Sequence, residues 1–257
     1  MVTFIDHQGF AGGFTLGGVQ AGMKLVAKYE EEGGFGAANC DNNRHLLGMD
    51  WKLQCAKPTD WDPVHADVVL ANPPCSGFSS MSWGVNRKSY GIKAKVNQCM
   101  WNLMDFAGRM PTAPKVLVME SVQAAAVTGL PLMRDLRARL EELTGERYWM
   151  YHVLQNNGAL GGASLRRRYF LVLSRIPFGV ETPDYGPAAT LRDAIGDLEP
   201  LDYRTMGRQK YKAPPSDWLV KNNMVNLDGW VDGHCVAPET NQVVKRILDL
   251  LDGDTDD

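Results

Sequence analysis

The chain of 257 residues is long enough for one large domain with an appendage, at about 100–200 residues per domain. Apolar residues make up 44% and charged residues 22%, which excludes collagen-like, coiled-coil and wholly disordered chains. The formal net charge of −3 argues against nucleic-acid binding over the whole surface but leaves room for a local basic cleft. No apolar run approaches about 18 residues and no secretory pattern opens the sequence, so we expect a soluble, cytoplasmic protein without membrane attachment.

Short apolar, β-rich runs alternate with helical patterns along the chain. The predicted strands are residues 2–5, 23–27, 67–71, 115–119, 148–154 and 169–174. The spacing of apolar residues predicts helices over residues 94–110, 131–143 and 238–251. This alternation predicts an α/β fold, a doubly wound and mostly parallel sheet with helices on both faces. Ligands of such sheets bind at the carboxyl ends of the strands.

The first predicted strand runs into a glycine-rich turn, residues 6–14, that leads into a helix. Such a turn lets backbone approach a ligand closely, with the helix N-terminus facing it, although ordinary tight turns look the same. Glu30 ends the second strand, where an acid typically accepts hydrogen bonds from the ribose of a nucleotide-type cofactor. The carboxyl group of Asp50 is suited to accept a hydrogen bond from an adenine amino group. The alternatives are a solvated charge for Glu30 and a helix cap for Asp50.

Three further strand ends carry reactive side chains. Cys75 follows two prolines that stiffen the turn after residues 67–71, and Glu120 ends another buried strand. Arg166 and Arg168 lie on the same face of a strand by its period of two. A buried structural cysteine is the usual alternative for a lone thiol. The pattern instead predicts that thiol, carboxyl and guanidinium groups converge on one cleft.

The five cysteines are an odd number and form no C-x-x-C pair. This argues against a disulfide framework and against a zinc site, so we expect reduced thiols and no metal.

Five motifs in this order resemble the cytosine-C5 DNA methyltransferase family. They are Gly-Gly-Phe at 12–14, Pro-Pro-Cys-x-x-Phe-Ser at 73–79, Glu-x-Val at 120–122, Arg-x-Arg at 166–168 and Gly-x-x-Val-x-Pro at 233–238. The resemblance covers residues 1–175 and 232–251, and residues 190–198 are similar to a segment that follows the arginine motif in that family. It implies a Rossmann-like methyltransferase that uses S-adenosylmethionine.

The resemblance also implies roles for the reactive side chains. Cys75 would add as a thiolate to C6 of cytosine, which makes C5 nucleophilic enough to accept a methyl group. Glu120 would bind N3 and the amino edge of the ring, and Arg166 and Arg168 would contact the ring carbonyl and hold the site together. Because these groups cannot reach C5 inside a duplex, the target cytosine must be flipped out or already single-stranded.

For the cofactor, the resemblance implies a larger set of residues. The family's aromatic residue and first glycine in the turn are replaced here by Gln8 and Phe10, so Phe10 or Trp51 would pack against the cofactor. The implied cofactor-binding residues are Phe10, Gly12, Gly13, Phe14, Glu30, Asp50, Trp51, Asn72, Pro74, His234 and Val236.

DNA binding is expected at the acid-free stretch of residues 76–99, which is placed to close over phosphates. The expected contacts are Ser79, Arg87, Lys88, Lys93 and Lys95. Family members carry a target-recognition domain after the arginine motif, whereas this chain has only residues 176–232 there. Sequence recognition is therefore expected to be short, absent or supplied by a partner protein.

The resulting domain organisation has four parts. Residues 1–175 form a catalytic and cofactor-binding domain, and residues 176–231 form a reduced recognition or loop region. Residues 232–251 return to the catalytic domain as a motif and helix, and residues 252–257 are an acidic tail.

Three alternatives remain open. His234 stands where the family has asparagine; it either makes the same hydrogen bond or pairs with the carboxylate of carboxy-S-adenosylmethionine, which would deliver a carboxymethyl group. Asn72-Pro73-Pro74 also resembles a motif of amino-group (N4 or N6) DNA methyltransferases, which need no thiol. A catalytically silent binding module is the third alternative.

Overall fold

The computed structural model describes residues 1–10, 12–31, 52–83, 90–177, 179, 181, 186–199, 209–221, 225 and 229–231. The chain divides into two compact units. The first unit holds Met1–Asn156 and Arg167–Thr182, and the second holds Asn157–Arg166 and Pro183–Asp257. Every strand predicted from the sequence lies in the first unit, so this unit decides the fold class.

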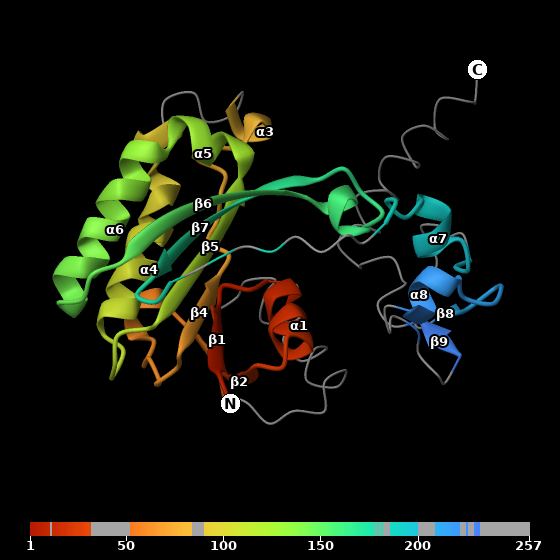
Figure 1. Ribbon diagram of the computed structural model, residues 1–257, viewed down its shortest axis with the longest axis horizontal. Helices are drawn as coiled ribbons and strands as arrows, with labels where there is room; N and C mark the ends of the chain where they lie inside the picture. Colours follow the sequence, from red (N-terminus) through yellow and green to blue (C-terminus); the bar gives the residue numbers. More distant parts are fainter. Residues whose placement is uncertain are drawn as a thin grey trace, which may run out of the picture. The chain divides into compact units, whose positions relative to one another are not determined.

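A seven-stranded sheet forms the centre of the first unit (Figure 1). Its strands are β1 (Thr3–His7), β2 (Lys24–Glu31), β3 (Lys52–Ala56), β4 (Val68–Ala71), β5 (Val116–Val122), β6 (Trp149–Asn156) and β7 (Arg167–Ser174). Their order across the sheet is β3-β2-β1-β4-β5-β7-β6. The strands β1 to β5 run parallel, whereas β7 runs antiparallel to both of its neighbours, β5 and β6. The predicted α/β class with a mostly parallel sheet is confirmed.

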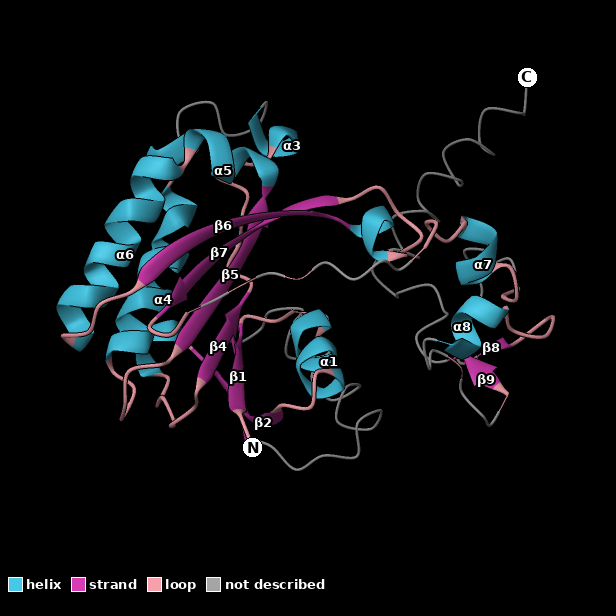
Figure 2. Ribbon diagram, in the orientation of Figure 1, coloured by secondary structure: helices cyan, strands magenta, loops and turns pink. Residues whose placement is uncertain are grey.

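Helices cover both faces of this sheet, as Figure 2 shows. On one face, α1 (Gly13–Gln20) packs through Phe14 and Val19 against a cluster that includes the buried Phe4 and Leu25. On the other face lie α4 (Gln98–Gly108), α5 (Gln123–Thr128) and α6 (Leu130–Thr144), whose apolar residues share the larger core with the central strands. This two-sided covering is the reason that the central strands are apolar on both faces.

The helices largely follow the apolar spacing of the sequence. In α4, Met100, Leu103 and Met104 are buried on one face, as the periodicity predicts. The predicted helix over 94–110 begins later than expected, because its first residues include a 3₁₀ turn at Lys95–Asn97, which follows another at Gly91–Lys93. Within the described ranges, no helix is long and apolar enough to cross a bilayer. The helix predicted over 238–251 lies outside the described residues.

All six predicted strands are present, and β3 is the strand of the seven-stranded sheet that the sequence did not reveal. Its five residues alternate Leu53 and Cys55 with polar neighbours, a span too short to separate a strand from a loop. The antiparallel direction of β7 was not predicted either. It follows from the short β6-to-β7 connection, which leaves no room for a crossover helix.

The second unit consists of short elements. These are a 3₁₀ turn (Asn157–Leu160), α7 (Leu191–Ile195), β8 (Gln209–Lys210), α8 (Asp217–Lys221) and β9 (Trp230–Val231). A capping box between Thr190 and Asp193 starts α7, and the indole N–H of Trp218 donates to the Gly161 carbonyl at 3.0 Å. Among the described residues of this unit, Leu219 is the buried apolar side chain, and local hydrogen bonds of this kind add to it.

Candidate active site

Three predicted catalytic residues lie at the carboxyl end of the sheet. Cys75 follows β4, and Glu120 lies in β5. Because β7 runs antiparallel to β5, the beginning of β7 reaches the same end, where Arg168 pairs in register with Val122. A thiol, a carboxyl group and a guanidinium group from three strands therefore come together. We name Cys75, Glu120 and Arg168 the thiol cluster.

Glu120 and Arg168 form an ion pair between Oε1 and Nε. Both side chains are mostly buried, with 14% and 19% of their surface exposed. Burial raises the pKa of the Glu120 carboxyl group, and the charge of Arg168 opposes that rise. Glu120 is therefore easier to protonate than a carboxyl group in water, and a protonated carboxyl group can donate a hydrogen bond.

The loop after β4 holds Cys75 in place. The Asn72 N–H donates to the His7 carbonyl at 3.0 Å and so ties the loop to the end of β1. Phe78 is fully buried, and its N–H donates to the Cys75 carbonyl at 3.0 Å. The Tyr90 hydroxyl donates to the Phe78 carbonyl, also at 3.0 Å. Cys75 thus projects from an anchored turn, as the two prolines before it suggested.

The electrostatic surroundings of Cys75 come from its two partners. Burial raises the pKa of its half-buried thiol, and the negative charge of Glu120 raises it further. Arg168 and a backbone hydrogen bond with Val122 lower the pKa, but by less. Arg168 therefore favours the thiolate, but burial and the charge of Glu120 together outweigh its effect on the pKa. The resting state of Cys75 is the thiol.

The glycine-rich turn after β1 has an unusual backbone. Gln8 and Phe10 have φ values of 54° and 50°, in the left-handed region that glycine adopts most easily. Phe10 stands where the resembling family has glycine, and its backbone conformation explains why glycine suits that position. Gly12, with φ of 84°, precedes α1, and open space surrounds Gly13. Phe10 is 49% exposed.

Buried charges lie beneath this turn. The side chain of Lys28 is fully buried, and its Nζ lies 3.6 Å from Asp6 Oδ2 and 3.8 Å from Glu30 Oε1. Glu30 Oε1 also accepts the Phe10 N–H at 2.8 Å. Burial raises the pKa of Glu30 to about 7, although Lys28 and the Phe10 N–H oppose it. We name Asp6, Lys28 and Glu30 the lysine cluster.

Sequence reasoning found Glu30 but missed Lys28. The only signal was a lysine between Ala27 and Tyr29, which are fully buried, in a strand of an otherwise apolar sheet. Lysine is almost never fully buried unless it is paired, so the position indicates buried carboxylates nearby.

Polar atoms without partners also gather at the end of β1. Within the described residues, Asp6 Oδ1, both ring nitrogens of His7 and Gln8 Oε1 are buried and have no hydrogen-bond partner. His7 is packed edge-on against the Trp61 and Phe106 rings, each centroid 4.9 Å away, and burial lowers its pKa to about 3. Unsatisfied buried groups are rare in folded proteins, and a ligand or water often completes them. The turn and its surroundings therefore fit a polar, nucleotide-like cofactor.

The remaining predicted residues fall into three groups. Phe14 packs against Phe170 with ring centroids 6.2 Å apart, so it links α1 to β7. Lys93 and Lys95 are exposed, Pro74 is exposed and Ser79 is half-buried. Asp50, Trp51, Arg87, Lys88, His234 and Val236 lie outside the described residues.

Arg166 differs from the prediction. The sequence period placed it on one strand face with Arg168, but β7 begins at Arg167 and Arg166 belongs to the second unit. Its carbonyl accepts the Asn157 N–H at 3.0 Å within that unit. The strand thus begins before the predicted residue 169 but does not include Arg166.

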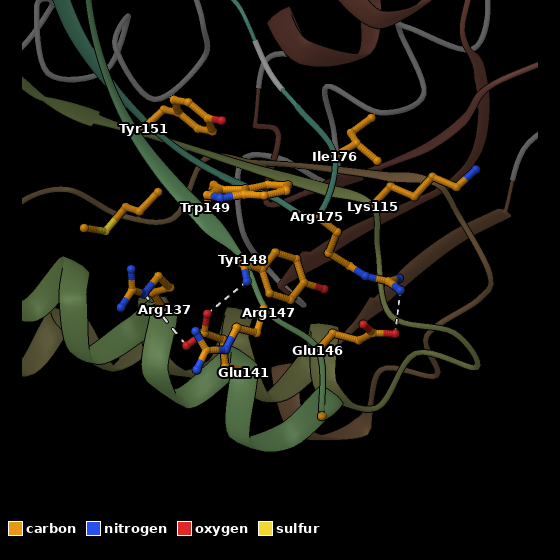
Figure 3. A pocket seen from close by; sticks show the side chains of 12 residues that line it. Lys115, Arg137, Glu141, Glu146, Arg147, Tyr148, Trp149, Tyr151, Arg175 and Ile176 are labelled. Carbon is orange, nitrogen blue, oxygen red and sulfur yellow. Dashed lines mark hydrogen bonds and ion pairs between the residues drawn. The ribbon is translucent and has the colours of Figure 1, made fainter.

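A cavity of about 1140 Å³ lies at the opposite end of the sheet (Figure 3). Lys115 before β5, Trp149 at the start of β6 and Arg175 after β7 line it. Its charges are largely paired, for example Arg175 with Glu146. None of the predicted site residues lines this cavity, so its size does not make it the candidate site.

Comparisons with solved structures identify proteins that share the fold. A structure of a DNA modification methyltransferase encoded within an E. coli prophage superposes with a TM-score of 0.60 at 15% identity, covering 83% of this chain and 61% of that one. The Entamoeba histolytica methyltransferase EhMeth gives a TM-score of 0.56 at 12% identity, covering 87% of this chain and 66% of that one. At these identities the likeness shows the shared fold, and this chain spans less than two thirds of either protein.

Sequence comparison gives the family. No curated protein sequence matches the chain. The family model described as C-5 cytosine-specific DNA methylase matches residues 2–222. This match includes every residue of the thiol cluster and the lysine cluster. The chain belongs to the C-5 cytosine-specific DNA methylase family.

Proposed function

We propose that this chain transfers a methyl group from S-adenosylmethionine to C5 of a cytosine in DNA, with Cys75 as the nucleophile. The observation that carries the proposal is the convergence of Cys75 with the Glu120–Arg168 ion pair at the carboxyl end of the sheet. Addition to a cytosine ring needs a thiolate at C6 and a proton donor at N3. The thiol cluster contains both groups.

The charges in the thiol cluster suggest how Cys75 becomes reactive. In the resting state, Glu120 raises the pKa of the thiol and neutralises Arg168. A protonated Glu120 that donates to N3 of cytosine carries no charge, so the field of Arg168 then acts on Cys75 alone. The thiol proton passes to solvent, and the sulfur adds to C6. Binding of the correct ring thereby activates its own nucleophile.

The cofactor would lie along the glycine-rich turn. When bound, S-adenosylmethionine supplies a methyl group on a positively charged sulfur, which C5 can attack. The proposed contacts among the described residues are Phe10, Gly12, Gly13, Glu30, Asn72 and Pro74, and Asp50, Trp51, His234 and Val236 complete the set. Loss of the C5 proton to a proton acceptor then restores the ring double bond and releases the Cys75 thiolate.

The substrate would be a cytosine outside the base stack, because the thiol cluster cannot reach C5 within a duplex. The exposed Lys93 and Lys95, with Arg87 and Lys88, would contact phosphates. Replacing these four residues by glutamine should weaken binding to all DNA sequences alike and reduce its dependence on salt. A strict recognition site of six base pairs in sequenced product DNA would contradict so small a recognition region and would favour a partner protein.

Covalent trapping tests the proposal. On DNA that contains 5-fluorocytosine, the fluorine at C5 cannot leave as a proton, so the enzyme should remain bonded to the DNA through Cys75. Cys75→Ala should form no adduct, whereas Cys99→Ala, which removes another half-buried thiol, should trap like wild type. Methylation without any adduct would exclude the thiol mechanism and favour an amino-group methyltransferase. Absence of both would favour a binding module.

The donor is tested separately. A carboxylated donor rests on His234, which lies outside the described residues, so we propose the unmodified donor. Competition between S-adenosylmethionine and carboxy-S-adenosylmethionine, followed by mass analysis of the product, should give methylcytosine alone. Carboxymethylcytosine that disappears in His234→Asn would overturn this choice.

A further inference from the structure

The buried lysine of β2 is the feature that the proposed reaction does not yet use. Its side chain is fully buried, and Nζ has three acceptors: Asp6 Oδ2 at 3.6 Å, Glu30 Oε1 at 3.8 Å and the Phe10 carbonyl at 3.5 Å. Asp6 is the direct cross-strand partner of Lys28 in the parallel register of β1 and β2. One ammonium group thus joins the end of β1, the glycine-rich turn and the end of β2.

Stability alone does not account for a lysine at this position. Replacing a buried ion pair by apolar residues of similar volume is often neutral or stabilising. The Lys28 side chain is fully buried, so its charge carries a desolvation cost that an apolar side chain would not. We therefore expect the role of Lys28 to lie in its electrostatic effect on the carboxyl groups around it.

Glu30 is the carboxyl group that this effect reaches first. Among the described residues, its charged neighbours are Lys28 and Glu31 on β2 and Asp6 on β1, and the turn adds the Phe10 N–H. From α1, the hydroxyl of Thr15 bonds Asp6 and not Glu30. Lys28 and the Phe10 N–H lower the pKa of Glu30, whereas burial and the two acids raise it, to about 7. Lys28 is the larger of the two lowering influences.

The charge of Glu30 matters for cofactor binding. An ionised carboxylate accepts hydrogen bonds with both oxygens, whereas a protonated one must donate with one of them. A ribose diol presents two donors. The Phe10 N–H already uses one lone pair of Oε1, so the ribose depends on the remaining acceptor capacity of an ionised Glu30.

We infer that Lys28 is a positioning residue of the cofactor site, which keeps the Glu30 carboxylate charged and holds it against the Phe10 turn. The inference rests on the proposed function, because it assumes that the turn binds S-adenosylmethionine. Lys28 would act through Glu30 on the ribose, which the methyl donor and its product, S-adenosylhomocysteine, have in common.

The test measures the affinity for S-adenosylhomocysteine by calorimetry between pH 6 and pH 9. Wild type should bind more tightly as the pH rises through about 7, because Glu30 loses its proton there. In Lys28→Met this midpoint should move up by at least one pH unit, so affinity at pH 7 should fall by about fivefold or more and recover at high pH. Lys28→Arg should keep the wild-type profile. Lys24→Met, an exposed lysine of the same strand, is the matched control.

Two further variants keep the test decisive. If Lys28→Met does not fold, the double variant Asp6→Asn, Lys28→Met removes both partners of the buried pair and should still show the upward shift. Glu30→Gln should bind weakly and without the step near pH 7.

The outcomes separate the two ideas. A wild-type protein that binds neither donor nor product would overturn the proposed function and this inference together. Wild-type binding with an unshifted midpoint in Lys28→Met would overturn only the inference, since Lys28 would then merely fill space. The inference would also be overturned if Lys28→Met changed the preference for S-adenosylmethionine, whose sulfur is cationic, over S-adenosylhomocysteine, whose sulfur is neutral. Lys28 would then act on the sulfonium directly.

Discussion

The lysine cluster and the thiol cluster both pair acid with one cation at the carboxyl ends of strands, but they differ in exposure. The lysine cluster has two carboxyl groups and an ammonium group, whereas the thiol cluster has one carboxyl group, a guanidinium group and a thiol. Lys28 is fully buried, whereas Arg168 and Glu120 remain 19% and 14% exposed. The lysine cluster lies beneath the glycine-rich turn and contacts the Phe10 N–H and carbonyl, and only its Glu30 is proposed to meet the cofactor. In the thiol cluster, all three side chains are proposed to meet the target base.

This difference in exposure determines what each pair of charges can do. In a sealed cluster the charges stay together, so their effect is a fixed geometry and a fixed electric field. In an open cluster, a ligand can take one partner of the ion pair and release the field of the other. Such a release suits a nucleophile that must be inert until its substrate is bound, as the resting thiol of Cys75 is.

The largest effect is expected for Cys75→Ala. The variant should form no methylated product, because no other described group could add to C6 at this position. Its affinity for S-adenosylhomocysteine should stay within about twofold of wild type, since Cys75 belongs to the open cluster. Product analysis checks the loss of methylation, and calorimetry checks the affinity for S-adenosylhomocysteine. Residual turnover at a tenth of the wild-type rate would mean that methylation does not require the Cys75 thiol of the thiol cluster.

Glu120→Gln should have the next largest effect. The amide keeps the shape of the side chain but cannot deliver a proton to N3, so single-turnover methylation should slow by about 10²–10⁴. In addition, the loss of the negative charge should lower the pKa of Cys75, because Glu120 now raises it. The variant's thiol should therefore react faster with iodoacetamide at pH 7 than that of wild type. Equal rates in both assays would assign Glu120 a purely structural role.

In the sealed cluster, Glu30 should make stability depend on pH. Its pKa rises from 4.5 to about 7 on folding, so the folded state holds a proton that the unfolded chain has released. The resulting stabilisation is complete below pH 4.5 and is lost as the pH rises to about 7, a difference of roughly 3 kcal/mol. Glu30→Gln should flatten this decrease between pH 5 and pH 8 in urea unfolding. A part of the decrease should remain in this variant, because burial also raises the pKa of Asp6.

The smallest effect is expected at the turn that covers the sealed cluster. Phe10→Gly should relieve the positive φ of 50° and stabilise the fold by up to about 1 kcal/mol, because the exposed ring contributes little burial. The same change should weaken cofactor binding if the Phe10 ring packs on the cofactor. Chemical denaturation with and without S-adenosylhomocysteine separates these two effects. A destabilised variant would show that the ring supports the turn.

Much of the fold was predictable because apolar periodicity marks strands that are buried on both faces. The same rule located Cys75 and Glu120, since residues at the carboxyl ends of parallel strands meet at one end of a sheet. The pattern failed where its period gives no information. It could not show that β7 runs antiparallel, nor that the strand begins at Arg167 and leaves Arg166 outside it.

Lys28 shows a different limit of sequence reasoning. A single lysine in a strand is normally taken for an exposed residue, and only the cross-strand neighbour Asp6 shows that it is paired. That neighbour depends on register, which local sequence does not specify. The ion pair of Glu120 with Arg168 was hidden for the same reason, although both residues were predicted to lie in one cleft.

The antiparallel direction of β7 also sets the order in which the two clusters are completed during synthesis. The lysine cluster needs only residues 6–30, whereas the thiol cluster draws on residues 75–168 and requires β7 to pair with β5. Contacts that are close in sequence form with little loss of chain entropy, and distant ones form late. About half of the length of the first unit is therefore synthesised after Cys75 and before Arg168, whose guanidinium group affects the thiol. Competence for the reaction would thus come as one of the last events of folding.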